Sequence, residues 1–246
     1  MSEVHVYGVV PAAAQPELEG DEVRLIAHRK IAALVSDMER GDARAVTVLR
    51  THWRVLEEAS ASTTVLPVRF GTVMADDRSV VEEFLEPSHD AIVAALAEMA
   101  GKVQLTVKGF YEEDALMAGI VARSPAIARL REQVRGVPEA ASYYKRIELG
   151  QRVAAEVERT REQDAEGVLE RLRPLAIDAR LEPPSTPDSA ANAAFLVEES
   201  RVGEFGKAVA GLGRELAGRI RLQLIGPLPP YSFTGDQLAA GERAWA

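Results

Sequence analysis

Hydrophobic and polar positions in the opening segment alternate with the period of a β-strand. In Glu3–Val10 every second residue shares a face, as in an extended chain. Val23–Ala27 and Lys30–Asp37 predict two further short strands, joined tightly around His28–Arg29. A loop rich in proline, alanine and acidic residues, Pro11–Asp21, separates the first strand from the second. The chain therefore opens on three predicted strands.

A helix and an interrupted strand are predicted next. Asp42 is suited to cap a helix over Ala43–Ser60, because its side chain can accept from free N–H groups of the first turn. Apolar residues recur in this segment at the spacing of one helical face; they are Val46, Leu49, Trp53 and Leu56. Thr64–Phe70 predicts a core strand that contains Pro67. Since proline cannot donate to a sheet ladder, this strand should lie at a sheet edge or bulge there.

The first half ends with helical segments and one clear strand. Asp77 is placed to cap a helix that Pro87 breaks or kinks, and a further helical stretch ends at Gly101. Val103–Val107 then alternates apolar and polar residues. The order β-β-β-α-β-α-β predicts an α+β domain that closes near Tyr111.

The second half opens with helical patterns. Glu112–Arg123 predicts one helix, and Ser124-Pro125 supplies an N-cap and a first-turn proline for the next. Tyr143–Arg173 has the pattern of a single long helix, and Leu175–Leu181 alternates as a strand.

A strand–helix–strand unit near the C-terminus has the most regular pattern of the chain. Ala193–Glu198 predicts a strand, Ser200 caps an amphipathic helix, and Ile220–Leu224 alternates again. This is a split β-α-β element of the kind used in ferredoxin-like sheets. The predicted fold class is therefore α+β with two domains. Residues 1–111 form an N-terminal α+β sheet domain, and residues 112–246 a C-terminal ferredoxin-like domain with additional long helices as a helical insertion and a proline-rich C-terminal extension.

Composition narrows the possible environments and partners. The net charge is −9, and neither half has the basic excess that attracts nucleic acid. No apolar run reaches the roughly 18–20 residues that a membrane span requires. The chain has no cysteine, and Met1–Val10 lacks the cationic and apolar regions of a secretory signal. We therefore expect a cytoplasmic protein that neither binds nucleic acid nor spans a membrane.

The side chains that usually carry catalysis form no recognisable pattern. The four histidines, at positions 5, 28, 52 and 89, lack metal-ligand spacing and are expected to be ordinary surface or strand residues. No phosphate-binding glycine loop and no nucleophile elbow is present. Gly203, Gly206, Gly211 and Gly213 lie within a helical pattern, where they are expected to permit close packing of the helix on the sheet. We expect no enzymatic activity, no cofactor and no metal.

One segment, Leu224–Gly235, combines stiffness with aromatic side chains. Three of the four residues from 227 to 230 are proline, which presets an extended backbone. The segment also presents Leu228, Tyr231 and Phe233. These side chains must pack on the protein's own sheet, dock on a partner, or do both.

Four sequence landmarks resemble one known family. GPLPPYSF at Gly226–Phe233 resembles the C-terminal signature GPWPPYSF of the GvpL/GvpF gas vesicle proteins, with Leu228 in place of the usual tryptophan. VLPVRFGTV at Val65–Val73 is similar to the LPxRFGT motif of that family. YGVV at Tyr7–Val10 resembles its opening strand, and YYKRIELGQRV at Tyr143–Val153 the start of its long helix.

The resemblance implies a function in gas vesicles, the gas-filled flotation organelles of some prokaryotes. Members of the family are minor or accessory proteins without known catalytic residues, and they are thought to contact the hydrophobic shell protein and other accessory proteins during assembly. The resemblance thus implies a structural protein or assembly factor located at the gas vesicle.

Two segments are candidates for contact with such partners. One is the edge strand, by strand addition, and the other is the aromatic arm. The predicted partner-binding residues are Leu66, Val68, Arg69, Phe70, Leu228, Tyr231 and Phe233. Arg69 could pair with an acidic group on the partner or form an ion pair inside its own domain. The alternative function is a ferredoxin-like regulatory module that binds a small ligand.

Overall fold

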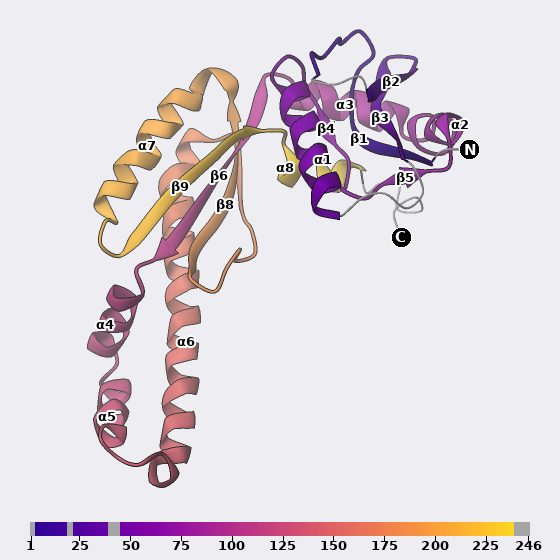
Figure 1. Cartoon of the computed structure of the whole chain (residues 1–246). Helices are drawn as coiled ribbons and strands as arrows, with labels where there is room; N and C mark the ends of the chain where they lie inside the picture. The colour runs from indigo at the N-terminus through magenta and orange to yellow at the C-terminus, as the bar shows by residue number, and fades with distance from the viewer. Residues whose placement is uncertain (1–2, 19–21, 39–44, 239–246) are drawn as a thin grey trace. The chain divides into compact units, whose positions relative to one another are not determined.

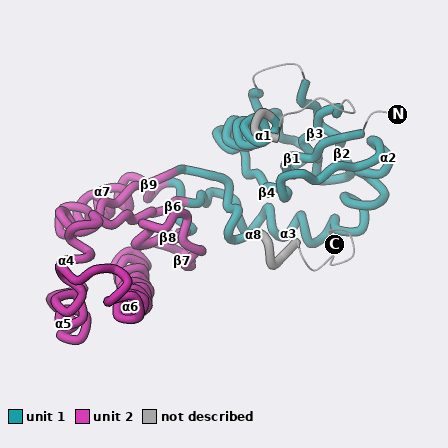
Figure 2. Tube along the Cα trace, turned by 60° about the horizontal axis from the view of Figure 1, so that its bottom comes forward, with its two compact units in different colours: residues 1–104, 196–199, 226–246 teal, residues 105–195, 200–225 magenta. Residues whose placement is uncertain are grey.

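The structure, a computed structural model, describes residues 3–18, 22–38 and 45–238 (Figure 1). It contains helices and strands, with two antiparallel sheets. The chain divides into two compact units (Figure 2). Unit 1 consists of residues 1–104, 196–199 and 226–246, and unit 2 of residues 105–195 and 200–225. Domain limits at residues 111 and 112 stay a prediction, because compactness does not show which parts fold independently.

The sheet of unit 1 is built around its first strand. The strand order is β2-β3-β1-β4, and β5 also pairs with β1. The strands are β1 Glu3–Pro11, β2 Val23–His28, β3 Ile31–Met38, β4 Leu66–Pro67 and β5 Val73–Met74. The tight connection between β2 and β3 is confirmed, and Arg29 adopts a positive φ of 54° there. The predicted edge position of the Pro67 strand is also confirmed, although only two of its residues form ladder pairs.

Helix α1, Ala45–Ser60, covers this sheet with a face that shares Leu56 with the predicted one but is otherwise shifted. His52, Val55, Leu56 and Ala59 are buried, whereas Leu49 and Trp53 are 37% and 43% exposed. Both sets recur at helical spacing, so the pattern alone did not discriminate between them. The predicted N-cap Asp42 and the side chain of Val46 lie outside the described residues.

Gly8 in β1 lets the helix and the edge strand come close to the central strand. A Cβ atom at this position would lie 2.8 Å from Leu56 Cδ2 and 2.8 Å from the backbone oxygen of Leu66. Real Cβ atoms do not tolerate such distances, since interiors are close-packed and core atoms give little. The register of β1 against β3 also shifts between Val6 and Gly8.

Two histidines lie buried between β1 and α1, contrary to the expectation of ordinary surface or strand positions for His52. His5 and His52 are 3% and 1% exposed, and His5 Nε2 lies 3.1 Å from His52 Nδ1. Because one nitrogen must donate and the other accept, the accepting ring must be neutral. Burial, and then the neighbouring His5, lowers the pKa of His52 to about 4, against a smaller opposing effect of the Val68 backbone. Burial also lowers the pKa of His5.

Three helical segments and one capping side chain complete the first part of the chain. They are α2 Asp77–Ser79, the π-helical η1 Val80–Leu85 and α3 His89–Met99. The cap is Asp76, not Asp77: its Oδ1 accepts from Ser79 N at 2.8 Å. Gly101 follows α3 with a positive φ of 69°, as the predicted helix end requires.

The second sheet has the order β7-β8-β6-β9. Its strands are β6 Lys102–Tyr111, β7 Asp178–Leu181, β8 Ser189–Glu198 and β9 Ile220–Leu228. The strand predicted at Val103–Val107 is confirmed as part of β6, but it does not belong to the sheet of the first three strands, because β6 pairs between β8 and β9. A local pattern identifies a strand but not its neighbours.

Helices connect these strands. They are α4 Glu113–Arg123, α5 Pro125–Val134, α6 Glu139–Leu172, the short η2 Arg173–Leu175 and η3 Glu199–Arg201, and α7 Val202–Glu215. Ser124 Oγ accepts from Ile127 N at 3.4 Å, as the predicted cap requires. Ser200 is not a cap, since it lies inside η3 and α7 begins after Arg201.

An ionic and hydrogen-bonded network fastens α6 to the sheet of unit 2. Arg219 Nη1 donates to both oxygens of Asp164 at 2.7 and 2.6 Å, and Tyr111 Oη donates to Asp164 Oδ2 at 2.8 Å. Burial, and next the bond to Asp164, raises the pKa of Tyr111. A half-buried, charge-assisted pair of this kind, joined by a tyrosine hydroxyl, fixes geometry as well as adding stability. The 34-residue helix α6 is thereby held at its C-terminal half.

The buried histidine pair predicts that the folded state becomes less stable at acidic pH. Because the pKa of His52 is lower in the folded than in the unfolded chain, the unfolded chain binds the proton more readily below pH 6.5. The free energy of unfolding should therefore fall between pH 6.5 and pH 4, by about 3 kcal/mol from His52 alone. Urea unfolding at a series of pH values measures this. In His52→Gln the fall should shrink by about that amount, and an unchanged fall would contradict the assignment.

Candidate partner-binding surface

The segment Val65–Val73 divides into a buried half and an exposed half. Leu66 and Val68 lie in the core of unit 1, so in this conformation they cannot touch a partner. Arg69 and Phe70 are exposed, and Phe70 has 39% of its surface accessible. A turn presents them: Thr72 donates through N and Oγ1 to Arg69 O at 3.2 and 2.8 Å.

Phe70 rests against the buried histidines. Its ring centroid lies 5.4 Å from that of His52 and 6.1 Å from that of His5, both in edge-on arrangements. Such arrangements suit the quadrupoles of aromatic rings. One side of Phe70 is therefore packed, while the accessible part of its surface is available for contact with another molecule.

The C-terminal segment is not the extended arm that its prolines predicted. β9 ends at Leu228, Pro229 and Pro230 are buried, and helix α8, Tyr231–Leu238, begins directly after them. Ser232 N donates to Gln104 Oε1 at 2.8 Å, and Thr234 Oγ1 donates to Pro230 O at 3.2 Å. Phe233 is only 6% exposed. The segment is packed on unit 1, and α8 lies against β4 and α3.

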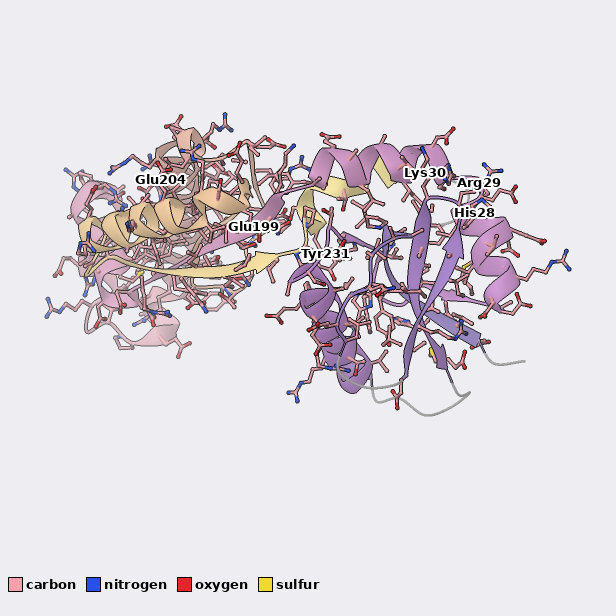
Figure 3. The ribbon with its side chains drawn as sticks, turned by 90° about the horizontal axis from the view of Figure 1, so that it is seen from above. His28, Arg29, Lys30, Glu199, Glu204 and Tyr231 are labelled. Carbon is pink, nitrogen blue, oxygen red and sulfur yellow. The ribbon has the colours of Figure 1, made fainter. Side chains whose placement is uncertain are left out.

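Tyr231, labelled in Figure 3, is half-buried, so it is the aromatic residue of this segment that remains partly accessible. Its ring centroid lies 4.7 Å from that of Trp53 in α1, and its side chain packs against the cluster that contains Val55 and Leu56. Tyr231 Oη is buried without a hydrogen-bond partner among the described residues. Burial raises the pKa of this hydroxyl.

Helix α1 thus connects two aromatic contacts through neighbouring residues. His52 supports Phe70, and Trp53 covers Tyr231. The structure brings Tyr231 and Phe233 onto unit 1 and leaves Leu228 half-buried. Sequence reasoning missed Trp53 as a surface residue, since its spacing with Leu56 also fits a buried face. The competing apolar pattern of Val55 and Ala59 was the available signal.

The accessible groups of this surface suit noncovalent contact. Among the described residues of unit 1, the exposed large apolar side chains are Leu25, Leu49, Trp53, Phe70 and Val73. Within the described ranges, no three His, Asp or Glu side chains converge as metal ligands do. No helix in that part of the chain combines the length and apolarity needed to cross a membrane.

Because the hydroxyl of Tyr231 has no hydrogen-bond partner among the described residues, its removal should stabilise the folded protein. Tyr231→Phe should raise the free energy of unfolding by about 1 kcal/mol, because a buried hydroxyl without a partner is destabilising. Tyr7→Phe is the matched control: Tyr7 Oη bonds Ser36 Oγ at 2.9 Å, and its loss should cost about 1 kcal/mol. Thermal and urea unfolding give both values. Equal destabilisation by the two substitutions would show that Tyr231 Oη has a partner.

Comparison with known proteins agrees with the sequence landmarks. A family described as gas vesicle synthesis protein GvpL/GvpF matches residues 3–235. Gas vesicle protein F of Streptomyces sp. is 34% identical over 93% of this chain and 98% of its own length. Gas vesicle protein L of Streptomyces sp. is 30% identical over 93% of this chain and 88% of its own length.

Solved structures show the same fold. The crystal structure of GvpF from Anabaena sp. matches with a TM-score of 0.76 at 24% identity, over 95% of this chain and 98% of that one. GvpF from Microcystis aeruginosa matches with a TM-score of 0.73 at 22% identity, over 95% and 99%. Sequence landmarks, relatives and fold agree over nearly the whole length. The chain therefore belongs to the GvpL/GvpF family of gas vesicle proteins.

Proposed function

We propose that this protein is a non-enzymatic assembly factor or minor structural protein of the gas vesicle, which acts in the cytoplasm and at the vesicle. In this proposal it binds the hydrophobic shell protein and other accessory proteins during vesicle formation. Membership of a gas vesicle family supports the setting. The exposed apolar groups of unit 1 support binding rather than catalysis as the activity.

A shell protein creates a physical problem before it is assembled. It must present an apolar face to gas and pair edge to edge with its neighbours, so the free subunit tends to aggregate. A partner that covers part of the apolar surface and carries net charge keeps the complex dispersed. This chain has a net charge of −9, which suits that task.

Phe70 is the observation that carries the proposal. It is a large aromatic side chain, exposed on a turn, and backed by a buried histidine pair. Arg69 stands beside it and is also exposed. Aromatic and arginine side chains are enriched at protein interfaces and among the residues that contribute most of the binding energy. We propose that Phe70 and Arg69 form the central contact.

The other predicted contact residues have different roles in this proposal. Leu66, Val68 and Phe233 are buried, so they position the surface from within. Tyr231 and Leu228 are half-buried, and they contribute at its margin. Binding of a partner strand to the edge of β4 is less favourable than the sequence suggested. The strand has only two residues, and α8 packs against it.

The proposal includes a two-domain organisation with a ferredoxin-like C-terminal part. The order along the chain is strand, helices, strand, strand, helix, strand, with strand order β7-β8-β6-β9. A four-stranded sheet of two split β-α-β elements has this arrangement. It supports the ferredoxin-like assignment, with α4, α5 and the long α6 as the helical addition.

The contact is tested by capture of co-expressed shell protein on affinity-tagged full-length chains. Phe70→Ala should weaken capture about tenfold, the effect of losing a modest interface anchor of about 1.4 kcal/mol. Leu25→Ala is the matched control, since Leu25 is equally exposed at 39% in the same unit but lies on the opposite edge strand β2. It should capture normally.

Thermal unfolding of both variants separates loss of contact from loss of fold. Undiminished capture by folded Phe70→Ala would remove Phe70 from the interface. If Phe70→Ala and Leu25→Ala weakened capture equally, the shell protein would bind nonspecifically to exposed apolar residues rather than at a defined site.

A further inference from the structure

Unit 2 has an open groove beside the free edge of its sheet. β9 is the last strand in the order β7-β8-β6-β9, so within the described part of the chain one of its sides has no strand partner. Helix α7 runs alongside it (Figures 1 and 2). The groove between α7 and β9 has a volume of about 570 Å³, and residues of both elements line it.

Three small residues line the helix side of the groove, together with Val209 and Arg214. Gly206, Ala210 and Gly213 of α7 line it at helical spacing. Each glycine in a helix costs about 0.5–1 kcal/mol relative to alanine. Their presence in α7 therefore calls for a reason other than helix formation.

The sequence led us to expect that these glycines allow α7 to pack closely on the sheet. The structure shows no such close packing at Gly206 and Gly213. A Cβ atom at Gly206 would lie 3.8 Å from Leu224 Cδ2, and one at Gly213 would lie 3.9 Å from Leu222 Cβ. These are ordinary van der Waals contacts, so alanine would fit both sites. What the glycines provide is open space above Leu222 and Leu224, which are only half-buried.

Two exposed arginines lie on β9 and on the adjacent end of α7. Arg221 is exposed in β9, and its guanidinium carbon lies 5.0 Å from the centroid of the Phe110 ring. Arg214, also exposed, lines the groove from the last turn of α7. Neither arginine forms an ion pair with a described residue. One carboxylate, Glu112, also lines the groove, at the end where its backbone N–H donates to Arg219 O at 3.0 Å.

We propose that β9 binds an extended segment of another protein as a fifth strand of this sheet. Along an added strand, alternate side chains point to opposite faces. Those on the α7 side would enter the space above Gly206 and Gly213, which suits large aliphatic side chains. Those on the other face would lie across from Arg221, which suits aspartate or glutamate, since opposite charges across strands attract.

The inferred partner is therefore a segment in which aliphatic and acidic residues alternate. A second copy of this chain fits the edge less well, because pairing of two β9 strands brings two arginine-bearing edges together. The site lies wholly within unit 2 and does not depend on the proposed shell-protein contact at Phe70.

The experiment measures the binding of two fluorescein-labelled ten-residue peptides to the full-length chain by fluorescence anisotropy. One peptide alternates isoleucine with glutamate, and the other alternates isoleucine with lysine. The glutamate peptide should bind at least tenfold more tightly. Arg221→Glu should reverse the preference, because it changes the charge that faces the added strand.

Large side chains that fill the groove should weaken peptide binding. Gly206→Leu with Gly213→Leu should weaken binding of the glutamate peptide at least tenfold. Gly203→Leu is the matched control: it lies in the same helix with nothing within 4 Å of its added Cβ, and outside the groove. It should bind as the wild type does. Thermal unfolding checks the fold, and Gly213→Leu alone serves if the double variant does not fold.

Several results would overturn the proposal. They are no binding of either peptide, equal binding of both peptides, or binding that the groove-filling substitutions leave intact. A concentration-dependent dimer in size-exclusion chromatography that Gly206→Leu with Gly213→Leu disrupts would assign the edge to a second copy instead.

Discussion

The close approach of helix α1 to strand β1 determines the character of unit 1. It requires the absence of a side chain at Gly8, where any Cβ would collide with Leu56 and the Leu66 backbone. It also removes His5 and His52 from water and places their ring nitrogens within hydrogen-bond distance of each other. With that face of α1 buried, Trp53 is turned outward and Phe70 comes to rest over the histidines. The exposed aromatic groups of the unit therefore follow from the packing beneath them.

Local patterns predicted most elements but not how they combine. The alternation in Glu3–Val10 and the tight turn near Arg29 are short-range features, and the structure has both. The sheet to which Val103–Val107 belongs depends on β8 and β9, which lie far along the chain. The outward position of Trp53 depends on competition between two helical faces, which spacing alone does not decide. Pro229 and Pro230 suggested an extended arm, yet prolines also precede helices, because they lack the N–H that a first turn leaves free.

The candidate site was predictable in location and only in part in detail. The motif at Val65–Val73 pointed to the segment that carries Arg69 and Phe70, both of which are exposed. It did not reveal that Leu66 and Val68 are buried, since apolar residues at an edge strand can face either side. The groove beside β9 could not be predicted from the sequence. Its existence depends on Gly206 and Gly213 lying next to an edge strand, and the strand order depends on contacts between residues far apart in the chain.

We propose that unit 1 binds the vesicle shell protein through the exposed face of Phe70. Site-specific photocrosslinking tests this most directly, with a benzophenone-bearing phenylalanine analogue incorporated at position 70 or, for comparison, at position 25, in cells that express the shell protein. The account predicts a crosslinked product with the shell protein from position 70 and none from position 25. A folded protein that crosslinks from neither position, or equally from both, would contradict it.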